Sequence, residues 1–155
     1  QYRELVEYAQ QQVGSIGLGT DALVGFPGED SRAFAATEEL IRELPFSNLH
    51  VFAYSRRQGT RACEMNGQVP GAVKKDRVAR LIELGQQKRE NFAKSWIGRE
   101  VSVLVETVET TGEGTGWTGE YLKARVKGRN IHTNQIVRFV PERVEGDVLV
   151  GEARP

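Results

Sequence analysis

Thiols and imidazoles, the usual ligands of zinc and of iron–sulfur clusters, are scarce in this sequence, which has one cysteine and two histidines. A structural zinc site takes four ligands of these types or carboxylates, and an iron–sulfur cluster is held by several thiolates. Cys63 therefore has no partner for a disulfide, and we expect a half-buried or free thiol. The sequence predicts no metal centre built by this chain alone.

Long apolar runs and an excess of charge of one sign are also missing. No segment approaches the ~18–20 apolar residues that cross a bilayer, so we expect no membrane partner. Twenty-one Lys+Arg balance 21 Asp+Glu, so only a local cluster can attract nucleic acid. The start, Gln1 to Leu5, has no targeting pattern and is typical of a helix interior. We expect a piece of a longer cytoplasmic protein.

The first half of the chain has the pattern of an α/β fold. A short apolar run from Ile16 to Phe26 is typical of a buried strand, and Asp30 or Ser31 can cap the helix that follows. The helical period ends at Pro45, and a second apolar run lies from Leu49 to Tyr54. Strand, helix and strand in this order predict one βαβ unit of a mostly parallel sheet.

The second half changes to an all-β pattern. A charged amphipathic helix opens at Pro70, and from Arg99 the apolar residues alternate with polar ones. Gly112, Gly114 and Gly116 are interpreted as a hairpin turn. Five short strands with glycine turns predict a small closed β-barrel, similar to the OB fold.

Two loops follow the predicted parallel strands, where ligands bind in such sheets. Gly25-Phe26-Pro27-Gly28-Glu29 lets the backbone turn and approach a ligand, although an ordinary strand-to-helix turn has the same composition. The segment from Tyr54 to Thr60 offers hydroxyls and guanidinium groups that suit an anionic or nucleotide-like ligand. A solvated loop is the alternative there.

A basic stripe is predicted in the barrel. Lys123, Arg125 and Lys127 alternate with apolar residues and so share one face of a strand, together with Tyr121. Between Tyr121 and Arg143, Glu142 is the only acid. Bases beside an aromatic ring favour single-stranded or looped RNA, whereas a solvated outer face would alternate in the same way. No pair of nucleophile and base stands out elsewhere in the chain.

Taken together, three segments strongly resemble the tRNA methylthiotransferases of the radical S-adenosylmethionine family. They are T-D-A-L-V-G-F-P-G-E from Thr20, L-H-V-F-A-Y-S-R-R-Q-G-T-R-A from Leu49 and G-Q-V-P-G-A-V-K-K-D-R from Gly67. The region from about Ile97 to Glu152 resembles their C-terminal TRAM domain. The resemblance implies residues 1–96 as the last part of a radical S-adenosylmethionine (β/α) barrel and residues 97–155 as the TRAM domain.

Within this family, two segments are most similar to the branch that acts on threonylcarbamoyl-adenosine beside the anticodon. They begin at Phe46 (F-S-N-L-H-V-F) and Gln87 (Q-K-R-E-N-F). The branch that acts on isopentenyl-adenosine is the next candidate.

The resemblance also implies the chemistry of the parent enzyme. Its cofactors are S-adenosylmethionine and two [4Fe–4S] clusters, and a 5′-deoxyadenosyl radical activates C2 of the adenine for methylthiolation. The cluster cysteines are absent from this chain, so we expect it to be inactive alone. The implied partners are tRNA, through the anticodon stem-loop, and the N-terminal portion of the same protein, with neither DNA nor membrane.

The resemblance assigns roles to residues by motif position. Leu23, Gly25, Gly28 and Ser55 are implied in cofactor binding. Substrate or RNA binding is implied for a second set: Arg57, Thr60, Tyr121, Lys123, Arg125, Lys127 and Arg138. Arg56 stands where the family usually has proline, and Gly119-Glu120-Tyr121 stands in place of the commoner Glu-Asn-Tyr, so both loops depart from the pattern. The alternative is a non-enzymatic RNA-binding or interaction module with the same architecture.

Overall fold

The computed structural model describes residues 1–154, which form two compact units. The first unit runs from Gln1 to Lys88 and the second begins at Arg89. The expected fold class, an α/β segment followed by a five-stranded β-barrel, is confirmed. The domain boundary expected between residues 96 and 97 stays a prediction. No helix in residues 1–154 is long and apolar enough to cross a membrane.

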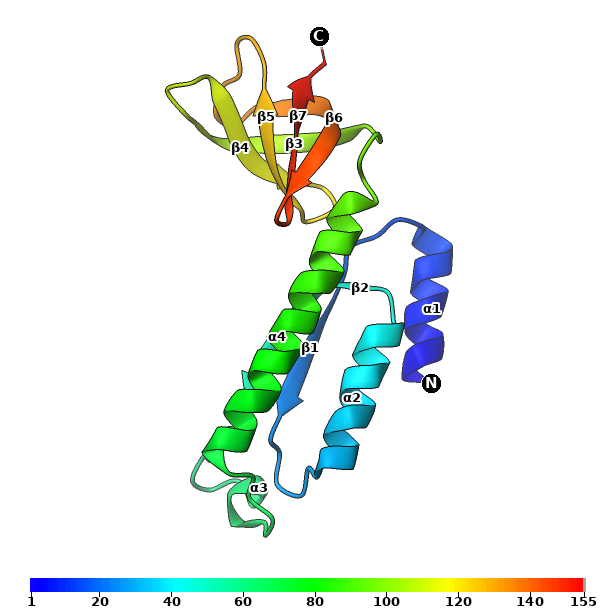
Figure 1. The fold of residues 1–155 in the computed structure, drawn as a ribbon, viewed down its shortest axis with the longest axis vertical. Helices are drawn as coiled ribbons and strands as arrows, with labels where there is room; N and C mark the ends of the chain where they lie inside the picture. Colours follow the sequence, from blue (N-terminus) through cyan, green and yellow to red (C-terminus); the bar gives the residue numbers. More distant parts are fainter. Residues whose placement is uncertain (155) are drawn as a thin grey trace. The chain divides into compact units, whose positions relative to one another are not determined.

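The first unit is built on two parallel strands with helices before, between and after them (Figure 1). Its elements are α1 (Tyr2–Val13), β1 (Leu18–Val24), α2 (Ser31–Glu43), β2 (Phe46–Ala53), α3 (Arg61–Glu64) and most of α4 (Gly71–Lys94), whose residues from Arg89 on belong to the second unit. Asp30 caps α2 as expected, because its carboxylate accepts a hydrogen bond from the backbone N–H of Ala33 at 2.7 Å. The predicted βαβ unit is therefore present.

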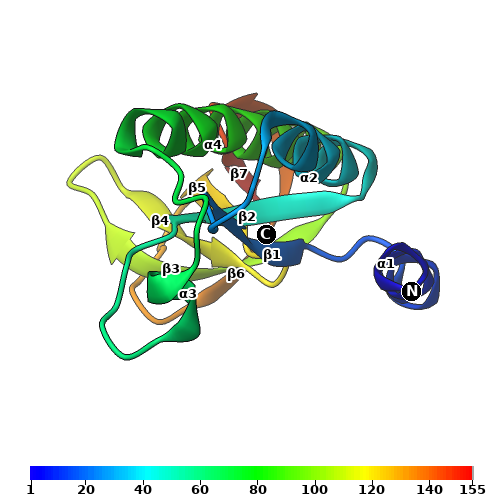
Figure 2. The same ribbon diagram turned by 90° about the horizontal axis from the view of Figure 1, so that it is seen from below.

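Only one face of the two-stranded sheet is covered. Helices α2 and α4 lie on the same side of β1 and β2 (Figure 2), where Val24, Phe34 and Leu81 form the core. On the opposite face Leu23 and Phe52, which are register partners, are 51% and 52% exposed. Parallel sheets are normally buried on both faces, so this sheet is an incomplete layer.

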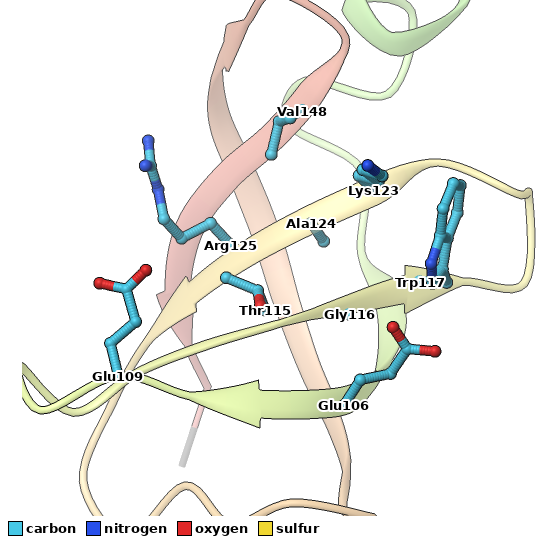
Figure 3. A pocket seen from close by; sticks show the side chains of 9 residues that line it. All are labelled: Glu106, Glu109, Thr115, Gly116, Trp117, Lys123, Ala124, Arg125 and Val148. Carbon is cyan, nitrogen blue, oxygen red and sulfur yellow. The ribbon is translucent and has the colours of Figure 1, made fainter.

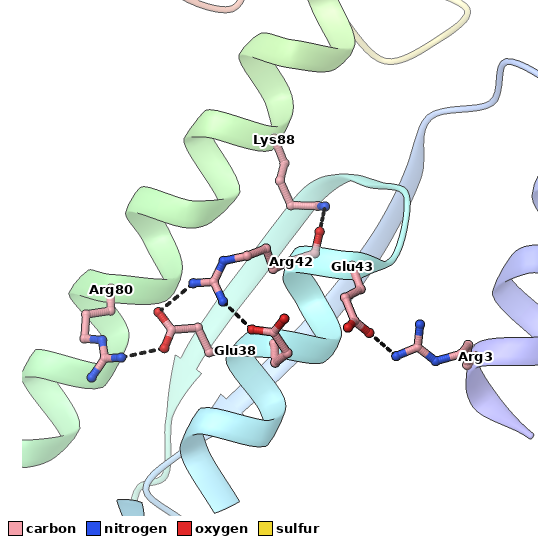
Figure 4. Close-up of polar contacts among 7 residues, drawn as sticks. Arg3, Glu38, Arg42, Glu43, Arg80 and Lys88 are labelled. Atoms are coloured by element: carbon pink, nitrogen blue, oxygen red, sulfur yellow. Dashed lines mark hydrogen bonds and ion pairs between the residues drawn. The ribbon is translucent and has the colours of Figure 1, made fainter. Parts of the chain in front are cut away.

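Ion pairs join the helices of the first unit at its surface (Figure 4). Arg42 contacts Glu38 and Glu39, and Arg80 approaches Glu38 at 2.5 Å. Lys88 donates a hydrogen bond to the carbonyl oxygen of Arg42 at 2.9 Å. Burial lowers the pKa of the Lys88 ammonium, and the charge of Arg42 lowers it further. These contacts tie α4 to α2 where both are partly exposed.

The second unit is a closed barrel with strand order β3-β4-β5-β7-β6. Its strands are β3 (Val101–Val108), β4 (Glu113–Thr118), β5 (Lys123–Lys127), β6 (Ile136–Glu145) and β7 (Val148–Ala153). Strand β6 pairs with β3 and closes the barrel, while β5 and β7 are parallel. Val103, Val126 and Phe139 are fully buried in its core, as the alternating pattern predicts.

The interpretation of the barrel glycines as one turn was wrong. Gly112 lies in the turn with φ +82°, but Gly114 and Gly116 lie inside β4 and face the core. A Cβ at Gly116 would lie 1.8 Å from the backbone oxygen of Leu104. These positions require glycine because neighbouring strands approach closely, not because the chain turns there.

Candidate functional sites

The turn after β1 is held together by a buried ion pair. Glu29 accepts hydrogen bonds from the backbone N–H of Gly25 at 2.9 Å and from the Arg77 guanidinium at 2.6 Å. The Arg77 side chain is only 6% exposed and also donates to the carbonyl oxygen of Glu29. Arg77 therefore fixes the turn to helix α4, and no local sequence pattern indicates this contact between residues 48 positions apart.

The two glycines expected at the cofactor have structural roles in this turn. Gly25 has φ +75°, and a Cβ there would lie 2.2 Å from Cγ of Lys74. The side chain of Lys74 crosses this glycine and donates to the carbonyl oxygen of Tyr54 at 3.0 Å. Gly28 has φ +87°, and its N–H donates to the carbonyl oxygen of Gly67. Neither glycine lines the hollow that the neighbouring strand ends form.

That hollow, of about 380 Å³, lies at the ends of β1 and β2. It brings together four of the residues expected at a ligand: Leu23, Ser55, Arg57 and Thr60. Leu23 and the adjacent Phe52 give it an apolar wall, while hydroxyls and a guanidinium supply polar groups. Such a mixture suits a nucleoside-like ligand, and the volume lies in the usual range for small-molecule pockets, about 300–1,000 Å³.

Tyr54 also lines this hollow; it opens the loop predicted to bind a ligand, but the family resemblance assigned it no role of its own. The side chain is 9% exposed, and its hydroxyl has no hydrogen-bond partner within residues 1–154. Buried hydroxyls are nearly always paired, so an additional group from a ligand or from further protein is expected to contact it. The residues present therefore fit the adenosine portion of S-adenosylmethionine.

Residues 1–154 do not fit an iron–sulfur cluster. No three His, Cys, Asp or Glu side chains among them lie close enough together to hold a metal ion. Cys63 is a half-buried free thiol, and its carbonyl oxygen accepts a hydrogen bond from Arg56 at 2.9 Å. This contact closes the loop in which arginine replaces the family's usual proline.

The basic residues of β5 point outward as their alternation predicts, but neighbouring strands bring acids to them. Lys127 lies 2.7 Å from Glu113, and Arg125 contacts both Glu113 and Glu145. The interpretation of β5 as a stripe with few acids nearby was wrong, because Glu113 and Glu145 lie outside the sequence window that suggested it.

Glu145 compensates part of the positive charge of the β5 stripe. Hydrogen bonds from Arg143 and then from Arg125 hold the pKa of the Glu145 carboxyl below its ordinary value. Glu145 therefore stays ionised and cancels part of the positive charge that a phosphate would otherwise meet.

Two further predicted RNA contacts lie away from this stripe. Tyr121 is 76% exposed with φ +60°, in the turn before β5, so the alternation of the strand does not extend to it. Arg138 lies in another hollow of about 410 Å³, together with Glu100 and Arg154. The structure thus places the basic residues around the barrel instead of on one continuous face.

A third hollow, of about 400 Å³, lies on the outer surface of the barrel (Figure 3). Trp117, Lys123 and Glu106 lie at one end of it, and Arg125 and Glu109 at the other. Sequence reasoning missed Trp117 because Gly114 and Gly116, which lie inside β4, were interpreted as part of a turn. The sequence does contain an indication of this site, because Trp117 is an aromatic residue at an outward position between core-facing Gly116 and Thr118.

Comparison with known proteins extends over almost the whole chain. The tRNA-2-methylthio-N(6)-dimethylallyladenosine synthase of Mycolicibacterium gilvum is 35% identical over 151 residues, which are 97% of this chain and 28% of that protein. The proteins of the same name from Moorella thermoacetica and Aquifex aeolicus are 38% and 34% identical, over 97% and 96% of this chain and 34% and 35% of theirs. No family model matches the chain.

The chain is homologous to the C-terminal part of tRNA methylthiotransferases. It spans about a third of the length of these curated relatives. The names of the relatives do not support the threonylcarbamoyl branch that the sequence segments favoured, since all three name dimethylallyl-adenosine.

Proposed function

We propose that this chain is the C-terminal part of a tRNA methylthiotransferase, in which the barrel binds tRNA and the hollow at the ends of β1 and β2 completes the pocket for cofactor and substrate. The parent enzyme adds a methylthio group to C2 of a hypermodified adenosine beside the anticodon. The similarity to the named synthases over nearly the whole chain is the observation that carries this proposal.

In the pocket, this chain supplies binding and orientation. Leu23 and Phe52 offer apolar contact to an adenine ring, and Ser55, Arg57 and the unpartnered hydroxyl of Tyr54 offer polar contacts. S-adenosylmethionine would supply the radical when bound to its cluster. The cluster ligands and the remaining wall of the pocket come from the N-terminal portion of the protein.

The adenosine that is modified is proposed to carry a dimethylallyl group, because that is the substrate in the names of the relatives. Anticodon stem-loops carrying dimethylallyl-adenosine or threonylcarbamoyl-adenosine can be compared as substrates of the full-length enzyme. Methylthiolation of the first alone is expected, and methylthiolation of the second alone would restore the branch that the sequence segments favoured.

The chain by itself is expected to bind RNA without catalysing the reaction. After anaerobic reconstitution it should hold no stoichiometric iron, and nearly four irons per chain would contradict this. Anticodon stem-loop RNA should bind more weakly as salt increases, since phosphate contacts release counterions. Changing Lys123, Arg125 and Lys127 together to Glu should abolish that binding, and unchanged affinity would remove these three residues from the interface.

The alternative, a non-enzymatic RNA-binding or interaction module, predicts the same RNA binding but no cofactor pocket. The two alternatives can be distinguished by measuring the binding of S-adenosylmethionine analogues to the full-length protein. Weakening of their binding by Ser55→Ala and Tyr54→Phe would favour the enzyme, and binding unaffected by both would favour the module.

A further inference from the structure

The hollow beside Trp117 has the composition of a nucleobase site. Trp117 on β4 is half-buried. Two cations lie over its indole: Nζ of Lys123, the register partner of Trp117 on β5, is 5.4 Å from the ring centroid, and Cζ of Arg89 is 5.7 Å from it. Figure 3 shows the indole standing away from the strand with Lys123 and the carboxylate of Glu106 beside it. An indole, a cation and a carboxylate around one hollow are a base-stacking surface, a phosphate contact and a hydrogen-bond acceptor.

An apolar row continues from this hollow across the barrel. Leu104 on β3 is the register partner of both Trp117 on β4 and Ile136 on β6. Leu104 is 47% exposed and Ile136 is 69% exposed. Apolar side chains in a row on adjacent strands give successive bases a surface to lie on, as aromatic side chains do in other single-strand binding barrels.

We propose that the Trp117 hollow binds one unpaired nucleobase of RNA, stacked on the indole, with its amino group donating a hydrogen bond to Glu106. This rests on the proposed tRNA-binding role of the barrel. An ionised carboxylate only accepts hydrogen bonds, so it suits the amino group of cytosine or adenine and disfavours uracil, which presents a carbonyl oxygen at that position.

Lys123 is the basic residue of this hollow that is best placed to contact an RNA phosphate. Arg125 is compensated by Glu113 and Glu145, whereas Lys123 has no ion-pair partner within residues 1–154 and is exposed. Its side chain can therefore leave the indole when a base stacks there. Lys123→Glu alone should therefore cause most of the loss of RNA affinity that is expected from changing all three basic residues of β5.

The stacking contact can be tested in the full 155-residue chain with Trp117→Leu and Trp117→Phe. Single-stranded oligocytidine and anticodon stem-loop RNA are the probes, and fluorescence anisotropy gives the dissociation constants. Trp117→Leu should weaken binding of oligocytidine by about 5- to 150-fold, the range that base–aromatic stacking supplies, and Trp117→Phe should retain most of the affinity. Tyr8→Leu, which removes a 60% exposed ring from α1, should leave binding unchanged.

The hydrogen bond to Glu106 is tested by comparing oligocytidine with oligouridine of equal length, because the two bases have similar size. The native chain should prefer oligocytidine by about tenfold, and Glu106→Gln, which offers both a donor and an acceptor, should remove that preference. Equal affinity of the native chain for both probes overturns the assignment of Glu106.

The outcomes distinguish the nucleobase site from the RNA-binding role of the barrel, on which it rests. Salt-dependent binding of stem-loop RNA that Trp117→Leu does not weaken overturns the nucleobase site and leaves the RNA-binding role of the barrel standing. No detectable binding of either probe by the native chain overturns both. Circular dichroism of each variant confirms that the barrel is folded, which is expected because Trp117 and Glu106 point away from the core.

Discussion

The two units of this chain differ in how completely they bury their β-strands. The second unit closes five strands into a ring, so its inward side chains are buried and no strand of the ring is left as an edge. The first unit pairs only two strands and leaves Leu23 and Phe52 exposed on one face. The barrel therefore buries its own strands completely, whereas the α/β unit presents a surface that further protein or a ligand is expected to cover.

The largest expected effect contrasts one phenylalanine from each unit. Phe139→Ala removes a fully buried ring from the barrel and should lower the free energy of unfolding by about 3–5 kcal/mol. Phe52→Ala removes a half-exposed ring and should change it by less than about 0.5 kcal/mol. Urea unfolding followed by tryptophan fluorescence reports on the barrel, which holds Trp96 and Trp117, and circular dichroism reports on the helices. Equal losses in the two variants would contradict the contrast between closed and open sheets.

The second prediction concerns how the open unit is held together without a second covering layer. Glu29→Gln should destabilise the first unit by about 3 kcal/mol, because it leaves the guanidinium of Arg77 buried without its counter-charge. The matched control Glu39→Gln breaks a surface pair with Arg42 and should cost less than about 1 kcal/mol. Thermal unfolding monitored by circular dichroism at 222 nm measures both, and a cost for Glu29→Gln no larger than that of its control would show that the buried pair is dispensable.

The third prediction uses the open face itself. Phe52→Lys and Leu23→Lys should reduce self-association of the chain, since an exposed apolar sheet face favours contact between copies. Sedimentation velocity over a range of protein concentrations measures the effect. Leu104→Lys on the barrel is the control for added charge at a similarly exposed leucine. An equal reduction of self-association by the control and by the two sheet variants would show that added charge, and not the exposed sheet face, causes the effect.

The smallest expected effect is the acid dependence of the barrel. Hydrogen bonds from Arg143 and Arg125 lower the pKa of Glu145 in the folded state below the unfolded value of about 4.3. The folded state therefore gains stability from Glu145 above the unfolded pKa and loses it as pH falls through the lower, folded pKa. Glu145→Gln should flatten this part of the stability curve in urea titrations from neutral pH to below about pH 4. An identical curve for both proteins would mean that these hydrogen bonds do not persist in solution.

The sequence was sufficient for the fold where local pattern and tertiary packing agree. Alternation of Val101, Val103 and Val105 predicted their burial, and Asp30 predicted the start of α2. It failed at β4, because Gly114 and Gly116 have the composition of a turn and only the close approach of neighbouring strands explains them. A glycine selected by packing cannot be distinguished in one sequence from a glycine selected by φ.

The candidate sites also differ in how far the sequence predicts them. Leu23, Ser55, Arg57 and Thr60 lie together because the ends of parallel strands meet at one edge of a sheet, which the order of elements alone predicts. The compensation of Arg125 by Glu145 depends on the pairing of β6 with β7 and of β7 with β5, which periodicity does not specify.

Amide and indole chemical shifts of the ¹⁵N-labelled chain, recorded while anticodon stem-loop RNA is added, test most directly whether recognition resides in the closed unit. The account predicts that shifts concentrate in the barrel, with the indole N–H of Trp117 and the amides of β4 and β5 among the largest, while α1 and α2 stay unchanged. Shifts confined to the α/β unit, or none at saturating RNA, would contradict it.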